Sequence, residues 1–364
     1  MDAHLQQART FFLEGVAHYQ AGRWTEAERQ FAAAASLAPG RPSVLTNLGA
    51  VRLKLGRVEE ALALLQEALA QEPGNAEALG HCAAAHAELG QPREALQRLE
   101  RALAIEPGKA ALWTLQGSVL KDLGRVDAAA VAFRQALAHG GDEELNRFYL
   151  AGVSGDAAPP KTAPQHYVEA LFDGYADQFD SHLVEALNYQ APRILTERIA
   201  ASGRRYAQAL DLGCGTGLCG PYLRKMAGHV TGVDLSGKML DRARALGLYG
   251  ELQQDDVIAF LRRVPGPYEL VVAADVFIYV GALDEVFAQL ARLMPPRGTF
   301  AFTVEAADAG DVQLRPSLRY AHSEAYLRRL ARENRFGVTG IERAPVREDQ
   351  RQPIAGFFVW MERA

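Results

Sequence analysis

The sequence predicts an all-α repeat solenoid followed by an α/β domain whose seven-stranded sheet is mostly parallel with one antiparallel strand. Three observations lead to this prediction. Residues 1–153 carry a pattern that repeats every 34 residues and ends in an additional helical segment. Residues 166–364 alternate short apolar runs with helical segments, as in an open parallel sheet. Residues 154–165 between them contain three prolines and several small residues, which indicates a linker.

The composition limits the classes of protein to which this chain can belong. The 364 residues are enough for two or three domains of ~150 residues each. A net charge of −5 without a basic stripe leads us to expect no nucleic-acid partner. No apolar run is long enough to cross a bilayer, and the first residues lack the basic and apolar regions of a secretory signal. Cys82, Cys214 and Cys219 complete no metal-ligand set, so we expect no metal site and a reducing, cytoplasmic location.

The repeat is visible in several columns that share one register. Pro39, Pro73 and Pro107 are spaced by 34 residues, and each follows an apolar, alanine-rich helical pattern. Glycine in a turn takes the left-handed conformation at low cost, and proline ends the second helix. The other columns are Gly22, Gly56, Gly90 and Gly124; Ala27, Ala61, Ala95 and Ala129; and Phe31, Leu65, Leu99 and Phe133.

These columns closely resemble the tetratricopeptide repeat (TPR). The four predicted units are residues 8–41, 42–75, 76–109 and 110–143, followed by a capping helix near Glu143–Val153. The resemblance implies a concave surface that holds a protein or peptide partner. The alternative is that the array packs on the second domain or mediates self-association.

The second domain begins with helices and continues as a sheet. Apolar residues between Val168 and Leu187 recur at helical spacing, so we expect one or two helices that cover the sheet. The last two strands follow each other closely and are expected to form a hairpin. The predicted strands are residues 206–212, 229–234, 251–254, 269–274, 298–304, 336–344 and 354–362.

A glycine-rich loop follows the first strand. Gly213, Gly215 and Gly217 allow a tight turn in which backbone N–H groups can face a ligand at the carboxyl ends of the strands. The residue types at 215–220 also match the dinucleotide-binding motif G-x-G-x-x-G. Asp234 follows at about the sequence separation expected for an acid that binds the ribose of a dinucleotide.

Three features favour a methyl donor over a dinucleotide. Asp211 lies within the strand just before the glycines, where a pyrophosphate would prefer no carboxylate. Asp255 and Asp256 follow the third strand, where the exocyclic amine of an adenine needs an acceptor. The sheet ends in a hairpin instead of a second nucleotide-binding half.

Four motifs together resemble the class I S-adenosylmethionine-dependent methyltransferases, which have a Rossmann-like fold. They are D-L-G-C-G-T-G at 211–217, G-V-D-L-S at 232–236, D-D-V at 255–257 and A-A-D-V-F-I-Y at 273–279. The resemblance covers about residues 165–364. The complete architecture is similar to that of the bacterial TPR-containing methyltransferases.

The resemblance implies which residues bind the donor, S-adenosyl-L-methionine, and its product S-adenosyl-L-homocysteine. Asp211 lies near the ammonium group, and Asp234 accepts from both ribose hydroxyls. Asp256 accepts from the adenine amine, with Asp255 as the alternative because the alignment there is uncertain by one residue. The full predicted set is Tyr175, Asp211, Gly213, Cys214, Gly215, Gly217, Leu218, Asp234, Leu235, Met239, Asp255, Asp256, Val257 and Asp275.

Further donor contacts follow from the same resemblance. The three loop glycines cradle the methionine and ribose parts of the donor. Leu235 and Met239 enclose the adenine on both sides, and the N–H of Val257 serves a ring nitrogen.

Methyl transfer from a sulfonium needs mainly positioning, so no particular catalytic base is required. The candidates for catalytic residues are His182, Asp275, Tyr279 and His322. Asp275 is expected to face the methionine end of the donor or the acceptor. The alternative for His182 is a surface or capping histidine. Arg319 and His322 belong to a segment after the fifth strand that often closes over the substrate in this fold.

Three functions are compatible with these features. The first is methyl transfer to an unidentified acceptor on a protein or carrier that the repeats deliver. The second is a small-molecule methyltransferase whose repeats serve assembly or regulation. The third is a non-catalytic scaffold with a degenerate methyltransferase domain, against which the intact glycine loop and acidic positions argue.

Overall fold

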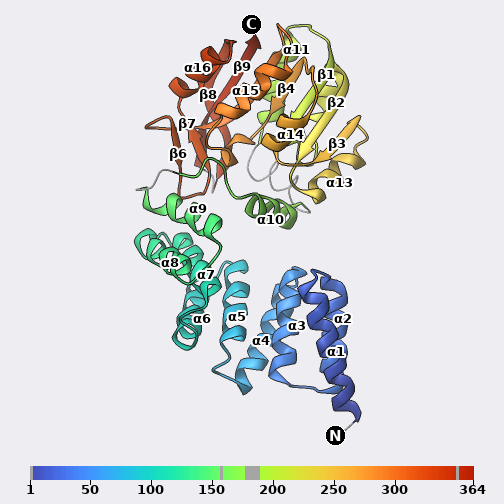
Figure 1. The fold of residues 1–364 in the computed structure, drawn as a ribbon, viewed down its shortest axis with the longest axis vertical. Helices are drawn as coiled ribbons and strands as arrows, with labels where there is room; N and C mark the ends of the chain where they lie inside the picture. The colour runs from blue at the N-terminus through green and yellow to red at the C-terminus, as the bar shows by residue number, and fades with distance from the viewer. Residues whose placement is uncertain (1–2, 156–158, 177–188, 350–351) are drawn as a thin grey trace. The chain divides into compact units, whose positions relative to one another are not determined.

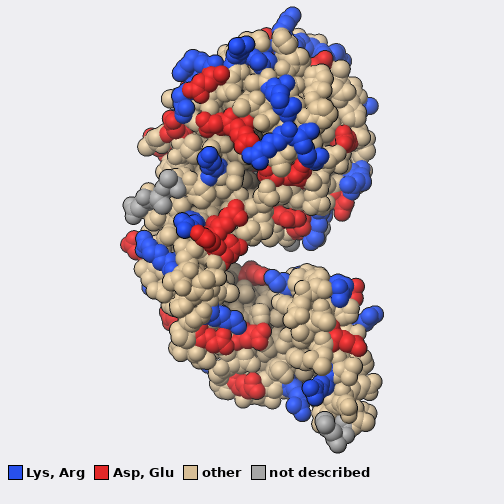
Figure 2. All heavy atoms as spheres, in the orientation of Figure 1, with Lys and Arg blue, Asp and Glu red and all other residues tan. Residues whose placement is uncertain are grey.

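The computed structural model describes residues 3–155, 159–176, 189–349 and 352–364, and it divides into two compact units (Figure 1). The first unit is Met1–Ser154 and the second is Gly155–Ala364. On the face drawn in Figure 2, basic and acidic side chains are interspersed over both units. No helix in the described ranges is long and apolar enough to cross a membrane.

The first unit is built from consecutive pairs of helices (Figure 1), which confirms the predicted repeats. The second helix of a pair ends two residues before the repeat proline, for example at Leu37 before Pro39. The helices are α1 (Ala3–Gln20), α2 (Trp24–Leu37), α3 (Pro42–Lys54), α4 (Val58–Gln71), α5 (Ala76–Glu88), α6 (Pro92–Ile105), α7 (Ala110–Asp122), α8 (Val126–Ala138) and α9 (Glu143–Ser154).

Close helix contact explains the glycines and large apolar residues of the repeat. A Cβ atom on Gly49 would lie 2.7 Å from the Leu65 side chain, and one on Gly117 would lie 2.4 Å from the Phe133 ring. The large residue of the second helix therefore packs directly on the backbone of the first. Leu65 and Phe133 are fully buried as a result.

The second unit is a sheet with helices on both faces. Its strands are β1 (Tyr206–Leu212), β2 (Ala227–Asp234), β3 (Glu251–Gln254), β4 (Leu270–Ala273), β5 (Thr299–Ala306), β6 (Val312–Leu314), β7 (Tyr320–His322), β8 (Phe336–Asp349) and β9 (Gln352–Arg363). Its helices are α10 (Gln165–Tyr175), α11 (Ala191–Ala201), α12 (Gly220–Met226), α13 (Gly237–Ala245), α14 (Val257–Arg263), η2 (Phe277–Tyr279), α15 (Asp284–Leu293) and α16 (Glu324–Glu333).

The strand order is β3-β2-β1-β4-β5-β7-β6, with β9 paired antiparallel to β5 and to β8. One apolar layer joins the sheet to α14, α15 and α16, and a second joins its other face to α11 and α12. Strands β1, β2, β3, β4, β5 and β7 run parallel, so their carboxyl ends meet at one edge.

The sheet differs from the prediction in two respects. The described residues form nine strands instead of seven, because the three-residue strands β6 and β7 are too short to show an alternating pattern. Two strands, β6 and β9, are antiparallel to their neighbours, where one was expected.

Part of the predicted linker belongs to the second unit. The Ala163 N–H donates to the carbonyl of Tyr279 at 2.9 Å, and the Ala282 N–H donates to the carbonyl of Lys161 at 2.9 Å. These hydrogen bonds fix residues 160–163 along the loop after β4. The second unit thus begins before residue 166, the predicted start of the domain.

Candidate active site

A pocket of about 380 Å³ lies at the carboxyl ends of the parallel strands. This volume falls within the ~300–1,000 Å³ typical of small-molecule sites. Its lining falls into two groups according to strand order. The acidic end contains Asp211 in β1, Asp234 at the end of β2, and Asp255 and Asp256 after β3. The arginine end contains Asp275 after β4, Tyr279 in η2, Arg319 just before β7 and Arg347 in β8.

The glycine loop has the tight turn expected from the sequence. Gly213 has a φ of +61°, and a Cβ atom there would lie 2.4 Å from Val276. The N–H of Gly215 donates to Asp234 Oδ2 at 2.8 Å, which ties the loop to the end of β2. Cys214 and Leu218 line the pocket.

Gly217 was expected to cradle the ligand, but it does not line the pocket. A Cβ atom on Gly217 would lie 2.9 Å from Leu246 and 3.1 Å from Tyr249. The close approach at Gly217 is therefore to the segment after α13, and its role is packing.

Asp211 is a buried carboxyl group at the base of the acidic end. It is 1% exposed and accepts a hydrogen bond from the Tyr249 hydroxyl at 2.7 Å. Burial raises the pKa of Asp211 to about 7, with a further contribution from the nearby Asp234. A cationic group in the pocket would favour the ionised carboxylate.

Asp234 connects two loops through its two oxygens. Oδ2 accepts from the Gly215 N–H at 2.8 Å, and Oδ1 accepts from the Ser236 N–H at 2.9 Å. Burial raises the pKa of Asp234, while these backbone hydrogen bonds lower it. A further backbone hydrogen bond comes from Leu235, so three backbone contacts orient this carboxylate.

Asp255 and Asp256 both line the pocket but differ in their partners. Asp255 accepts from the Asp256 N–H at 2.9 Å through Oδ1 and forms an ion pair with Arg263 at 2.7 Å through Oδ2. Asp256 caps α14, accepting from the N–H groups of Ile258 and Ala259 through Oδ1 alone. Within the described part of the chain, Asp256 therefore retains one oxygen without a hydrogen bond.

The two residues expected to enclose an adenine lie in different environments. Leu235 lines the pocket beside Val257, the first residue of α14. Met239 is a fully buried residue of α13 and does not line the pocket, so the structure corrects that part of the prediction.

Helix α10 covers one side of the pocket, which it lines with Val168, Leu171 and Phe172. The Ser236 hydroxyl donates to Asp173 of α10 at 2.5 Å, which connects this helix to the loop after β2. His182 and the side chain of Tyr175 lie outside the described residues.

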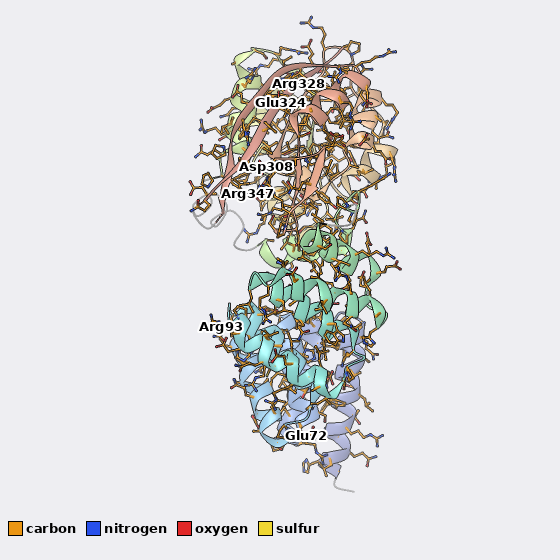
Figure 3. All side chains as sticks on the ribbon, turned by 90° about the vertical axis from the view of Figure 1, so that its left-hand side faces the viewer. Glu72, Arg93, Asp308, Glu324, Arg328 and Arg347 are labelled. Carbon is orange, nitrogen blue, oxygen red and sulfur yellow. The ribbon has the colours of Figure 1, made fainter. Side chains whose placement is uncertain are left out.

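The arginine end is held by a buried ion-pair network. Arg347 is 3% exposed and donates to both oxygens of Asp275 and to Glu305. Arg315 donates to the second oxygen of Glu305 at 2.9 Å. Figure 3 labels Arg347 near the end of β8.

Asp275 itself has a strained backbone. Its φ is +61°, and its N–H donates to Thr303 Oγ1 at 2.8 Å. A non-glycine residue in this region costs about 1–3 kcal/mol and persists where its surroundings hold it. The Arg347 ion pair and the Thr303 hydrogen bond provide those surroundings.

Tyr279, predicted as a candidate catalytic residue, lies at the pocket wall. Its hydroxyl accepts a hydrogen bond from Arg319, and its ring packs edge-on against Phe172 with centroids 5.5 Å apart. Burial raises the pKa of Tyr279, so its hydroxyl stays protonated at neutral pH.

His322 was predicted to be catalytic, and its position corrects that prediction. The ring is fully buried and does not line the pocket. Its Nε2 lies 3.1 and 2.9 Å from the carbonyl oxygens of Val280 and Gly281, so the nitrogen carries the proton and donates to them. Burial lowers the pKa of His322 to about 4, which keeps it neutral.

The sequence prediction missed Arg347 and Tyr249. The predicted strand ended at residue 344, whereas β8 continues to Asp349. Tyr249 follows α13 in a segment without a motif. Arg347 stands close to the charged residues Arg343, Glu348 and Asp349, so the local composition gave no signal that separates it from them.

Comparisons with known proteins agree with this architecture. Three TPR models match residues 12–76, 52–119 and 110–138, and a methyltransferase-domain model matches residues 209–298. The chain thus combines TPRs with a methyltransferase domain, which confirms both halves of the prediction.

Curated relatives match part of the chain. A malonyl-[acyl-carrier protein] O-methyltransferase from Enterobacter lignolyticus is 32% identical over 142 residues, 39% of this chain and 55% of the relative. A ubiquinone biosynthesis O-methyltransferase from Xylella fastidiosa is 29% identical over 136 residues, 36% of this chain and 53% of the relative. The chain spans about half the length of the curated relatives it matches.

Solved structures are similar to parts of the chain. Magnesium protoporphyrin IX methyltransferase from Synechocystis PCC 6803, with bound SAH, is 17% identical with a TM-score of 0.44, covering 55% of this chain and 99% of that one. MamA from Desulfovibrio magneticus RS-1 is 21% identical with a TM-score of 0.36, covering 40% of this chain and 82% of that one.

Proposed function

We propose that this protein is an S-adenosylmethionine-dependent methyltransferase. The observation that carries the proposal is the acidic end of the pocket, where Asp211 in β1, Asp234 at the end of β2 and Asp256 after β3 line the same cavity from three adjacent strands. Ionised carboxylates only accept hydrogen bonds. They therefore fit a ligand that presents donors at three points: an ammonium group, a ribose diol and an adenine amine.

Each acid has a role in this proposal. Asp211 faces the ammonium group, Asp234 accepts from the ribose hydroxyls, and Asp256 accepts from the adenine amine with the oxygen that does not cap α14. The N–H of Val257 belongs to the first turn of α14, has no partner within the helix and serves a ring nitrogen. Gly213 and Gly215 leave room for the backbone to approach the ligand.

The same geometry argues against a dinucleotide. A pyrophosphate at the glycine loop would lie beside Asp211, which is 1% exposed and accompanied by Asp234. The buried Asp211 and the half-buried Asp234 would repel a doubly charged phosphate bridge beside them.

When bound, the donor supplies a methyl group on a positively charged sulfonium. The contribution of the chain is to bind, orient and exclude water. Helix α10 covers the pocket, and Ser236 connects that helix to the donor-binding loop. Tyr279 and Arg319 at the arginine end face the acceptor.

We further propose that the repeats bind a protein and deliver a protein-bound or carrier-bound acceptor. Four helix pairs provide the surface, and one relative is named for a substrate on an acyl-carrier protein. The second candidate is a small-molecule methyltransferase whose repeats serve assembly, which the ubiquinone-biosynthesis relatives favour.

Labelled methyl transfer tests the activity. The full chain is incubated with bacterial extract and methyl-tritiated donor, and tritium is followed into protein and small-molecule fractions. The proposal predicts transfer that disappears in D256A. A rate no higher than that of extract alone would contradict it.

Removal of the repeats separates the two candidates. Gly155–Ala364 has its own apolar layers on both faces of the sheet, so a chain of these residues is expected to fold. Delivery by the repeats predicts that this chain binds donor normally but labels the same acceptor at least tenfold more slowly. Unchanged labelling would favour the small-molecule candidate.

A further inference from the structure

We propose that Tyr249 is a positioning residue of the donor site: its hydroxyl holds Asp211 in the orientation that meets the amino-acid end of the ligand. This role rests on the proposed methyltransferase function. It adds to that function a residue that does not line the pocket and acts through one that does.

The Tyr249 hydroxyl bonds directly to the buried acid at the base of the pocket. It donates to Asp211 Oδ2 at 2.7 Å, across 38 positions of sequence. Because Asp211 is 1% exposed, groups of the chain orient its carboxyl group in place of bulk water. Anchoring one oxygen restricts rotation about the Cβ–Cγ bond. The donated hydrogen bond also favours the ionised carboxylate, which is the form that attracts an ammonium group.

Three glycines make room for the Tyr249 ring. A Cβ atom on Gly217 would lie 3.1 Å from Cε2 of the ring, and one on Gly220 would lie 3.0 Å from Cε2 and 3.2 Å from the hydroxyl oxygen. A Cβ atom on Gly232, in β2, would lie 2.9 Å from Cδ1, across the ring from Cε2. The ring is therefore held closely between the glycine loop and β2, where a side chain at any of the three positions would crowd it.

The backbone next to Tyr249 is anchored to the same strand. The N–H of Gly250 donates to the carbonyl of Val230 in β2 at 2.9 Å, and β3 begins at the following residue, Glu251. Ring and backbone are thus both fixed, and together they fix the position of the hydroxyl relative to Asp211.

These contacts give a physical cause to two glycines of the G-x-G-x-x-G match at 215–220. In a dinucleotide site the second glycine lets the backbone approach the pyrophosphate, and the third lets the helix pack closely on the strand. Here the corresponding residues, Gly217 and Gly220, approach Tyr249, and neither lines the pocket. The glycines therefore admit a tyrosine that supports an acid, and an acid fits a cationic group and not a phosphate.

The effect of the Tyr249 hydroxyl should be confined to one part of the ligand. Asp234 accepts from the backbone N–H groups of Gly215 and Ser236, and Asp256 accepts from N–H groups of α14. These two acids, which we assign to the ribose and the adenine, do not depend on Tyr249 for their orientation. Only the amino-acid end of the donor meets Asp211.

Calorimetry on the full chain with two ligands tests this role. S-adenosylhomocysteine and methylthioadenosine share the adenosine and the thioether sulfur, but only the first has an amino-acid end. We expect Y249F to weaken S-adenosylhomocysteine binding at least fivefold and to leave the Kd for methylthioadenosine within twofold of wild type. The matched control Y222F removes the hydroxyl of a tyrosine on α12 that does not line the pocket, and it should leave both Kd values within twofold.

A double variant shows whether Tyr249 acts through Asp211. D211N should weaken S-adenosylhomocysteine binding more than Y249F does, because it removes the charge itself. Adding Y249F to D211N should then change the Kd by less than twofold, since the effects of two residues that act through one contact do not add. A role in packing alone would lower the affinity for both ligands and would add to the effect of D211N.

Three outcomes would overturn this role of Tyr249. They are an unchanged S-adenosylhomocysteine affinity in Y249F, an equal loss of affinity for both ligands, and full additivity with D211N. A wild-type chain that binds neither ligand would instead contradict the proposed function.

Discussion

Arg347 donates hydrogen bonds from Nη1 to both carboxylate oxygens of Asp275, at 2.6 and 2.8 Å, across 72 positions of sequence. The contact joins the long hairpin strand β8 to the end of β4. It holds Asp275 in a left-handed backbone conformation at the pocket wall.

Removal of this arginine should destabilise the fold. R347A leaves Asp275 and Glu305 as buried carboxylates without their shared cation, which we expect to lower the free energy of unfolding by about 3–5 kcal/mol. Urea denaturation measures the effect. The control R343A removes an exposed arginine of the same strand, 3.9 Å from Asp308, and should change stability by less than ~0.5 kcal/mol. Similar small losses in both variants would contradict the role of the network.

Replacement of Gly213 by alanine should reduce stability more than replacement of Gly247, a glycine with a similar backbone conformation. Gly213 and Gly247 have φ values of +61° and +64°, but a Cβ atom on Gly247 would meet nothing within 4 Å. Both alanine variants should lose about 1–2 kcal/mol from backbone strain. G213A should lose about 1–3 kcal/mol more because its Cβ displaces Val276, and its donor affinity should fall. Equal stability and affinity in the two variants would show that the loop adapts freely.

Donor affinity should depend on pH through Asp211. Its pKa is raised to about 7, so the carboxylate is ionised above pH 7 and protonated below it. An ammonium group binds the ionised form better, and the Kd for S-adenosylhomocysteine should therefore rise as the pH falls from 8 to 6, by up to about tenfold per unit below the pKa.

Two variants test whether Asp211 causes this pH dependence of the donor affinity. D211N should bind more weakly and show a flat profile. Y249F removes a hydrogen bond that lowers the pKa of Asp211, so its inflection should move to higher pH. A flat wild-type profile between pH 6 and 8 would exclude Asp211 as the partner of the ammonium group.

His322 should matter for stability and not for proton transfer. H322A leaves two carbonyls without their donor and a cavity in the core, for an expected loss of about 2–4 kcal/mol in unfolding free energy. H139A, at an exposed helix end, is the control. Normal stability of H322A together with a collapse of kcat would instead restore His322 as a base.

Local patterns predicted much of the molecule. The repeat columns and the strand–glycine-loop–helix unit are determined by neighbours in sequence, so both were predictable. Asp234 was predictable because a carboxylate at the end of β2 lies beside the loop after β1 in any sheet of this order.

Long-range contacts account for most of what the sequence did not reveal. The pairing of Arg347 with Asp275 depends on β8 continuing beyond its apolar core, through Pro345 and a run of charges. His322 resembled a base because sequence does not show that two carbonyls occupy its Nε2. Met239 matched a motif position, but the helix buries its side chain.

A calorimetric titration of the full chain with S-adenosylhomocysteine, beside NAD⁺ and the D234A variant, tests the central claim most directly. The account predicts saturable one-site binding of S-adenosylhomocysteine and no binding of NAD⁺. In D234A the affinity should fall by roughly 10–100-fold, because hydrogen bonds to a charged group contribute about 1.5–3 kcal/mol. No binding of S-adenosylhomocysteine, tighter binding of NAD⁺, or an undiminished affinity in D234A would contradict the account.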